Sequence, residues 1–266
     1  MRFLKTRLST CLGIGALVIV MSGSLWSVAA HAGEANAKRM LKAMSDYVGS
    51  QERISFEFDE ALGVVTDKDQ KLTLVSSGSL ALARPSSIRA KRSAGHADVE
   101  MVYDGKTLTV LERTENLYTQ IARVGTVDAL VDALREEYGR PLPAADLILV
   151  NSYDPLMEDV TDVKDLGIGI VNGVKCAHLA FRKEVIDFEI WIAQGDKPYP
   201  CRYTVTSKDI PHSPQFTAQI RNWMVGDAVL ADGFSFDAPA DAKKVELDEL
   251  REGLSDLPSN FTGAAQ

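Results

Sequence analysis

The clearest fold signal in the chain is VKDLGIGIVNGVKCAHLAFRKEVIDFEIWIA, residues 163–193. The Asn172-Gly173 dipeptide separates two largely apolar runs, 163–171 and 174–182. Asn-Gly between such runs is the strongest short-range signal for a hairpin turn. A third run, 185–193, follows after only two residues. Strands this close in sequence must pair antiparallel, because a parallel crossover needs a dozen or more residues.

The same period-two alternation extends over most of the chain on both sides of this stretch. Asp104-Gly105 marks a second hairpin, between strands predicted at 100–103 and 107–111. The spacing between runs again leaves no room for parallel crossovers. The remaining predicted strands are 54–59, 72–82, 88–91, 118–122, 201–207, 216–225 and a last short one at 234–236.

Helical periodicity is confined to a few segments. A stripe at 3.6-residue spacing predicts a helix over 35–47, with Gly49 as its stop. Thr126 is a good N-cap for a second helix, which runs to Tyr138 before Gly139 and Pro141. Short helical turns are expected over 142–157, and a short amphipathic helix over 245–254. The sum is a mainly β, α+β chain: one strongly curved antiparallel sheet with helices on one face.

The N-terminus has the three parts of a secretory signal peptide. Arg2, Lys5 and Arg7 precede an apolar run over 11–21, and Ala30-His31-Ala32 supplies small residues for a cut after Ala32. An uncleaved anchor over 11–30 is the alternative, and the polar break at 22–24 favours cleavage. We therefore predict a signal at 1–32, a single domain at 33–257, a disordered tail at 258–266, and a soluble periplasmic protein.

Charge argues against nucleic acid as a partner. The 266-residue chain has 29 basic and 37 acidic residues, a net charge of −8, and loss of the three basic signal residues makes the mature charge −11. A nucleic-acid binder needs a basic footprint. The one basic patch contains four residues of one predicted strand region. These residues are Arg84, Arg89, Lys91 and Arg92. The patch is either the solvent-exposed face of an edge strand or a site for an anionic head group.

Catalytic and metal signatures are missing from the sequence. There is no GxSxG, HExxH, P-loop or GxGxxG motif. The three histidines of the mature chain, His96, His178 and His212, are widely spaced. We therefore predict a non-enzyme with no cofactor and no metal site.

Two cysteines remain once Cys11 leaves with the signal. Cys176 and Cys201 fall at the same end of the predicted sheet but two strands apart. That is about 10 Å in a flat sheet, against a limit of about 7 Å for a disulfide. A bulge or a displaced strand start would close the gap. Because the compartment is oxidising, we predict a Cys176–Cys201 disulfide.

Several segments together resemble a known family. GVKCAHLAFR at 173–182, DFEIWI at 187–192 and KPYPCRYTV at 197–205 look like motifs of a family of predicted bacterial periplasmic proteins. That family is grouped with the LolA/LolB-like lipoprotein carriers. Weaker matches are the FSFDAP segment at 234–239 and the strand from Arg84-Pro85 to Arg89. The resemblance covers roughly residues 35–247.

The resemblance implies a half-open β-barrel with a helical lid over an apolar cavity that carries lipids or acylated proteins. It implies that Arg89 matches the strand arginine that engages the lid. His178 and Trp191 match motif positions without an assigned role. No lipobox follows the apolar run of the signal, so an anchored, LolB-like form is not expected.

These observations predict a periplasmic carrier for a lipid, an acyl chain or a lipidated protein, with an envelope protein as a further possible partner. The lid is expected to run from Thr126 to Met157. The alternatives are a structural or partner-binding module whose concave face is filled, and an enzyme that uses His178 or His212. The residues predicted to contact ligand are Phe56, Phe58, Arg89, Tyr103, Leu130, Leu134, Trp191, Tyr203, Phe216 and Trp223.

Overall fold

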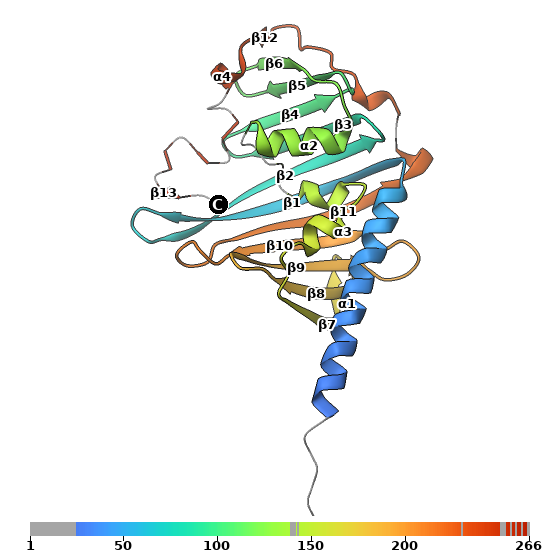
Figure 1. The fold of residues 1–266 in the computed structure, drawn as a ribbon. Coiled ribbons are helices and arrows are strands. Elements are labelled where there is room, and N and C mark those ends of the chain that lie inside the picture. Colours follow the sequence, from blue (N-terminus) through green and yellow to red (C-terminus); the bar gives the residue numbers. More distant parts are fainter. Residues whose placement is uncertain are drawn as a thin grey trace, which may run out of the picture.

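The computed structural model describes residues 25–138, 142, 144–229, 231–250, 254–255, 257–258, 260–261 and 263–264. The predicted signal core at 11–21, and the helix-ending residues Gly139 and Pro141, lie outside these residues. One large, mainly antiparallel sheet forms the body of the molecule, and the main helices lie on one face (Figure 1).

The helices and 3-10 turns (η) are α1 (Leu25–Ser50), α2 (Val127–Glu136), η1 (Ala145–Ile148), α3 (Tyr153–Met157), η2 (Gly226–Ala228), η3 (Ala231–Phe234) and α4 (Leu247–Leu250). The strands are β1 (Arg53–Thr66), β2 (Lys71–Ala83), β3 (Ser87–Ala94), β4 (Asp98–Tyr103), β5 (Thr107–Glu112), β6 (Leu117–Ala122), β7 (Asp162–Val171), β8 (Val174–Arg182), β9 (Ile186–Ala193), β10 (Pro200–Ser207), β11 (Gln215–Val225), β12 (Lys243–Lys244) and β13 (Gly263–Ala264).

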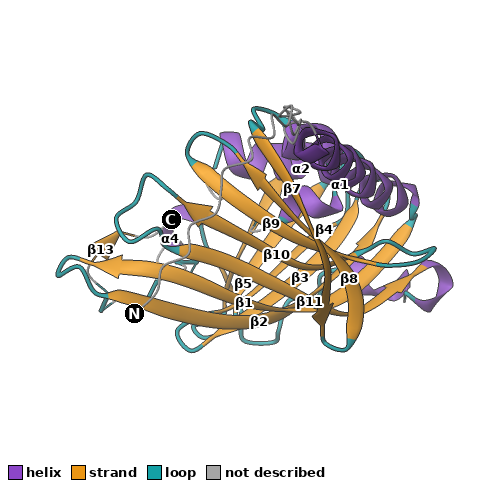
Figure 2. Ribbon diagram, turned by 90° about the horizontal axis from the view of Figure 1, so that it is seen from below, coloured by secondary structure: helices purple, strands orange, loops and turns teal. Residues whose placement is uncertain are grey.

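The sheet consists of two meanders joined at one seam. Strands β1 to β6 follow one another in space, and so do β7 to β11. The seam is the antiparallel pairing of β1 with β11, from Ile54 opposite Val225 to Leu62 opposite Phe216. Because β6 and β7 do not meet, the sheet curls without closing, as Figure 2 shows. This confirms the predicted curved sheet with helices on one face.

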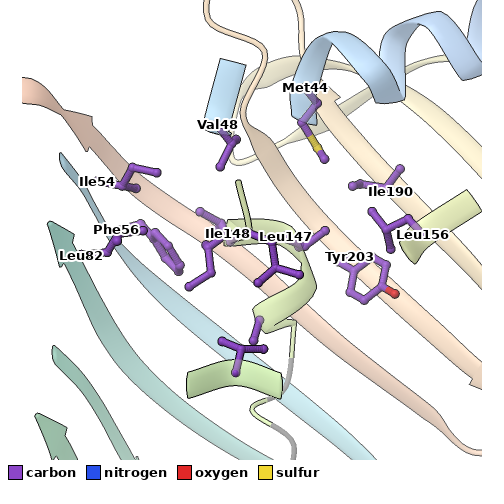
Figure 3. Packing of buried hydrophobic residues seen from close by; sticks show 14 of the residues in the cluster. Met44, Val48, Ile54, Phe56, Leu82, Leu147, Ile148, Leu156, Ile190 and Tyr203 are labelled. Carbon is purple, nitrogen blue, oxygen red and sulfur yellow. The ribbon is translucent and has the colours of Figure 1, made fainter. Parts of the chain in front are cut away.

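Different helices cover the two halves of the concave face. Helix α1 lies across the β7–β10 half, and α2 lies over the β1–β6 half (Figure 1). Between them η1 and α3 fill the centre, where Leu147, Ile148 and Leu156 meet Met44 and Val48 of α1 (Figure 3). Figure 3 also shows Phe56 and Tyr203 pointing into this core from opposite sides of the seam. One continuous core thus runs beneath the helices.

Both predicted hairpins are confirmed, and most predicted strands match within a few residues. Helix α1 begins at Leu25, ten residues before the predicted start, and the alanines at 29, 30 and 32 favour this extension. The proposed cut after Ala32 therefore falls within a continuous helix. Of the predicted helix at 245–254, only Leu247–Leu250 is helical among the described residues.

The strand predicted at 234–236 is wrong. Its first residue ends the 3-10 turn η3, and the chain there crosses the convex face of β3 instead of joining the sheet. Phe236 packs instead on Tyr118 of β6, with the ring centroids 5.3 Å apart. Two residues of the predicted tail, Gly263–Ala264, pair with Val65 and Thr66 of β1.

Gly78 allows the sheet to curl tightly beneath an aromatic ring. It lies opposite both Phe58 and Arg92, on β1 and β3. A Cβ at residue 78 would lie 2.1 Å from the Lys91 carbonyl oxygen and 2.3 Å from Cζ of Phe58. The ring of Phe58 therefore occupies the space that any other side chain would need.

We expect Gly78→Ala to lower the free energy of unfolding by about 1–3 kcal/mol, the usual cost of overpacking. Urea unfolding measures the effect. Gly95→Ala is the matched control, because a Cβ there meets nothing within 4 Å. Equal stabilities for the two variants would contradict the close packing of Phe58 on Gly78.

Candidate functional site

The concave face of β1–β6 is built from rows of side chains that lie opposite one another across neighbouring strands. Strand alternation places every second residue on this face. Row 1 is apolar and almost fully buried. It contains Ile54, Leu82, Ile88, Tyr103, Leu108 and Ile121. Row 2 is apolar except for Thr119 and includes the smaller side chains of Ala90 and Val110. It contains Phe56, Leu80, Ala90, Met101, Val110 and Thr119.

A cavity of about 230 Å³ lies above row 2. Its walls are aliphatic and aromatic. Strand β11 contributes Ala218 and Ile220 across the seam, and η1 contributes Leu147 and Ile148 from above. The remaining covering residues come from α2, the segment after it, the start of η1 and the C-terminal segment: Leu134, Tyr138, Leu142, Ala144, Ala145, Leu247 and Leu254.

The next two rows are more polar. Row 3 contains Phe58, Gly78, Arg92, Val99, Glu112 and Leu117, and row 4 contains Glu60, Ser76 and Ala94. Arg92 and Glu60 line the cavity, and both are partly exposed. Glu112 is occupied with its own turn, since its carboxylate accepts the backbone N–H groups of Thr114 and Glu115. The cavity is therefore sealed at row 1 and reaches solvent at rows 3 and 4.

The other half of the concave face is filled. Phe181 and Phe188 stack with ring centroids 4.7 Å apart, and Tyr203 lies 5.9 Å from Phe188. Burial raises the pKa of Tyr203. Leu41 and Met44 of α1 are fully buried in the same cluster. Large rings therefore occupy this half of the concave face.

Arg84 holds the cover of the cavity in place. Its Nη2 donates to the carbonyl oxygen of Ile148 at 2.8 Å, and its Nε donates to that of Gln51 at 3.1 Å. Its Nη1 lies 3.7 Å from Asp128 of α2, whose carboxylate accepts the Val150 N–H. Burial lowers the pKa of Arg84. One guanidinium thus links η1, α2 and the C-terminal end of α1.

Three of the ten residues predicted to contact ligand line the cavity: Phe56, Phe58 and Leu134. Tyr103 is buried in row 1 and donates a hydrogen bond to the Gly125 carbonyl oxygen. Leu130 is one of the buried residues of α2. Trp223 packs behind the cavity wall, stacked 5.4 Å from Phe56. Tyr203 belongs to the filled half, and Phe216 lies near the start of β11, opposite Leu62.

Arg89 lies on the convex face, away from the cavity. It binds the buried Glu100 and donates to the Gly233 carbonyl oxygen at 2.8 Å. Burial alone would raise the pKa of Glu100, but the hydrogen bond from Arg89 and the charges of Arg89, Lys91 and Arg113 lower it. Arg89 therefore anchors the C-terminal segment. This corrects the lid contact expected of Arg89, because strand alternation turns it outward and Arg84 reaches the cover instead.

Trp191 is also on the convex face. His178, Trp191 and Arg202 lie opposite one another on β8, β9 and β10. The His178 ring stacks on Trp191 at 4.1 Å, and its Nε2 lies 2.6 Å from the Glu189 carboxylate. Gly169 packs against the indole, since a Cβ there would come within 2.9 Å of it. This ladder fastens the β7–β8 hairpin to the back of the sheet.

Cys176 and Cys201 are neighbours at the end of this ladder. A bulge in β10 between Pro200 and Arg202 turns Cys201 to the convex face, where it joins Cys176 and Ala193 in a small buried cluster. A hydrogen bond with Cys201 lowers the pKa of Cys176, and the same contact with burial raises that of Cys201. Both are free thiols in the structure, so the predicted bond is not formed there.

Other kinds of site find no support in the part of the chain that the structure describes. No group of three His, Cys, Asp or Glu side chains could hold a metal ion there. In the same residues, no helix has the length and apolar character needed to cross a membrane.

Most of the cavity residues were absent from the sequence prediction. Leu80, Ala90, Met101 and Val110 line it without any motif. The residues predicted to contact ligand were mainly large aromatic residues on strands. A cavity forms instead where the side chains are small or of medium size. The regular alternation of these residues was the available signal.

Comparison with known proteins gives one family match and several remote fold matches. The model of a family described as "Predicted periplasmic protein (DUF2092)" matches residues 37–248. Lipoprotein LppX of Mycobacterium tuberculosis is 10% identical, with a TM-score of 0.45 over 71% of this chain and 96% of that one. LprF of Mycobacterium bovis is 11% identical, with a TM-score of 0.40 over 79% and 99%.

A LolA superfamily protein of Nitrosomonas europaea is 11% identical, with a TM-score of 0.33 over 75% of this chain and 97% of that one. No protein with a curated description matches this chain in sequence.

We expect Arg84→Met to lower the free energy of unfolding by about 2 kcal/mol, because buried carbonyl groups lose their donor. Amide exchange over 145–150 should also become faster. Arg182→Met is the control, since Arg182 is exposed and its Nε lies 3.3 Å from Asp187. The same exchange rates in both variants would rule out a role for Arg84 in holding the cover.

Proposed function

The chain belongs to the DUF2092 family of predicted periplasmic proteins, and we propose that it is a soluble periplasmic binding or carrier protein. Its ligand is a lipid, an acyl chain or the acyl group of a lipidated protein, held above row 2. The signal at 1–32 directs export, and cleavage after Ala32 releases the mature protein. The single observation that carries this proposal is the cavity, with its almost wholly apolar walls.

The size of the cavity supports an apolar ligand. An apolar cavity of about 150 Å³ stays dry and binds benzene. A space of about 230 Å³ therefore accepts a longer hydrocarbon segment. Each CH₂ group that moves from water into it contributes about 0.8 kcal/mol. Several methylene groups suffice for tight binding without any polar contact.

The position of the histidine–carboxylate pair supports a non-enzymatic role. His178 and its partner Glu189 lie on the convex face, away from the cavity. The filled half of the concave face fits the alternative of a partner-binding module. The cavity above row 2 favours the carrier, because the alternative module is expected to have a filled concave face.

We expect protein isolated from the periplasm to carry lipid, detectable by native mass spectrometry. We also expect the delipidated protein to bind the apolar dye 1-N-phenylnaphthylamine. Ala90→Phe should weaken dye binding at least about tenfold, since the new ring fills the space above row 2 and removes more than about 1.4 kcal/mol of burial. Fluorescence titration measures the affinity.

Ala180→Phe adds the same ring to the convex face of β8 and is the matched control. Equal dye affinity for both variants and the parent protein, together with lipid-free material from the periplasm, would refute the carrier function.

We propose further that Cys176 and Cys201 become a disulfide in the periplasm. Oxidation joins the two sulfur atoms, releases two protons and passes two electrons to a protein disulfide of that compartment. The bulge at Cys201 already places the two thiols in contact. The bond would close a loop of about 25 residues and stabilise the fold by about 3 kcal/mol.

Thiol titration of the denatured periplasmic protein is expected to find no free thiol. Reduction should lower the free energy of unfolding by about 3 kcal/mol, and the Cys176→Ser, Cys201→Ser double variant should not respond to reductant. Two free thiols per chain in periplasmic material would disprove the bond.

A further inference from the structure

Polarity changes steadily along the floor of the cavity. Row 1 is apolar and sealed, row 2 is apolar, and rows 3 and 4 bring Arg92 and Glu60 to its edge. The change occurs within four residues of β1, where Phe56 and Phe58 are followed by Glu60. A wholly apolar ligand would gain nothing from charged groups at one end.

From this gradient we propose that the ligand is a single-chain amphiphile bound tail first. Its chain lies above row 2 with its end toward row 1, and its head group lies at rows 3 and 4. Arg92 donates hydrogen bonds to acceptor oxygens of the head group. The inference rests on the proposed carrier function and adds the class and orientation of the ligand.

Arg92 is the cation best placed for this contact. Lys91, next to it in β3, also borders the cavity, but its ammonium lies 3.8 Å from Glu100 on the convex face. Arg89 is directed the same way. Arg92 instead lies opposite Gly78 in row 3 and lines the cavity together with Phe58. Its forked guanidinium suits carboxylate, phosphate or acyl carbonyl oxygens.

Glu60 should affect the binding of an anionic head group in the opposite direction to Arg92. It lies one row further out, where its carboxylate accepts a hydrogen bond from Ser76. A negative charge here repels an anionic head group that Arg92 attracts. Neutralising the two residues should therefore have opposite effects on an anionic amphiphile and little effect on an apolar probe.

Size limits the ligand to one chain. In the filled half of the concave face, Phe181 and Phe188 stack and Tyr203 packs at a tilt beside them, so these rings occupy the space that a second chain would need. The cavity is bounded on that side by Ala218 and Ile220 of β11.

Displacement of 1-N-phenylnaphthylamine by dodecanoate and by N-dodecanoylglycinamide, at pH 8 on the full mature chain, tests the orientation. Arg92→Gln should weaken dodecanoate binding about five- to tenfold. Glu60→Gln should strengthen it about twofold. Binding of the apolar dye itself should change less than about twofold in both variants. Arg92→Lys keeps the charge but not the forked donor geometry, so it should bind dodecanoate more weakly than the parent protein and more tightly than Arg92→Gln.

The two amphiphiles distinguish a free anionic lipid from a protein-linked acyl chain. A loss confined to dodecanoate indicates the former, and equal losses indicate the latter; both place the head group at Arg92. Arg182→Gln and Glu184→Gln are exposed controls. Dodecanoate binding that is unchanged by both cavity variants, or lost equally in Arg92→Gln and Arg92→Lys, would overturn the inference. Absence of dye binding in the parent protein would instead refute the carrier function.

Discussion

The pairing of β1 with β11 is the contact on which the rest of the structure depends. It joins residues about 160 apart in sequence, from Ile54 opposite Val225 to Leu62 opposite Phe216. Each meander alone would be an open sheet with one uncovered apolar face. Joined at this seam, they share one curved face, and α1 and α2 can cover it together. Because the loop closed by this pairing is long, its entropic cost has to be met by the burial that follows.

Two of the irregularities in strand register decide which side chains reach which face. Across from Phe56, β11 has an extra residue at Asn222, whose φ is 54°. The extra residue changes the alternation, so Trp223 turns inward and stacks between Phe56 and Tyr199. The bulge at Cys201 acts the other way and turns a thiol outward to Cys176. Each bulge thus moves one side chain that strict period two would place on the opposite face.

The cavity is a consequence of unequal side-chain volume over one continuous sheet. Stacked rings fill the β7–β10 half against α1, whereas the small side chains of Ala90 on β3 and Ala218 on β11 leave space on the other half. Arg84 then fixes the cover at a set height by binding Ile148 and Asp128. The helices thus cover the concave face, and the small side chains beneath them leave the cavity. The functional hypotheses depend on that difference in volume.

Strand alternation and turn residues sufficed to predict the antiparallel meanders, both hairpins, the helical cover and their arrangement in one curved sheet. These are local properties, since Asn172-Gly173 or Asp104-Gly105 determines a turn through backbone preferences within a few residues. The family resemblance also followed from short segments. The position of the cavity did not, because it depends on which rows face each other across the seam and on how far α2 lies above them. Arg89 and Trp191 face outward, and Arg84 holds the cover, for the same reason: register and bulges, which arise only when distant strands pair, decide the face on which each side chain lies.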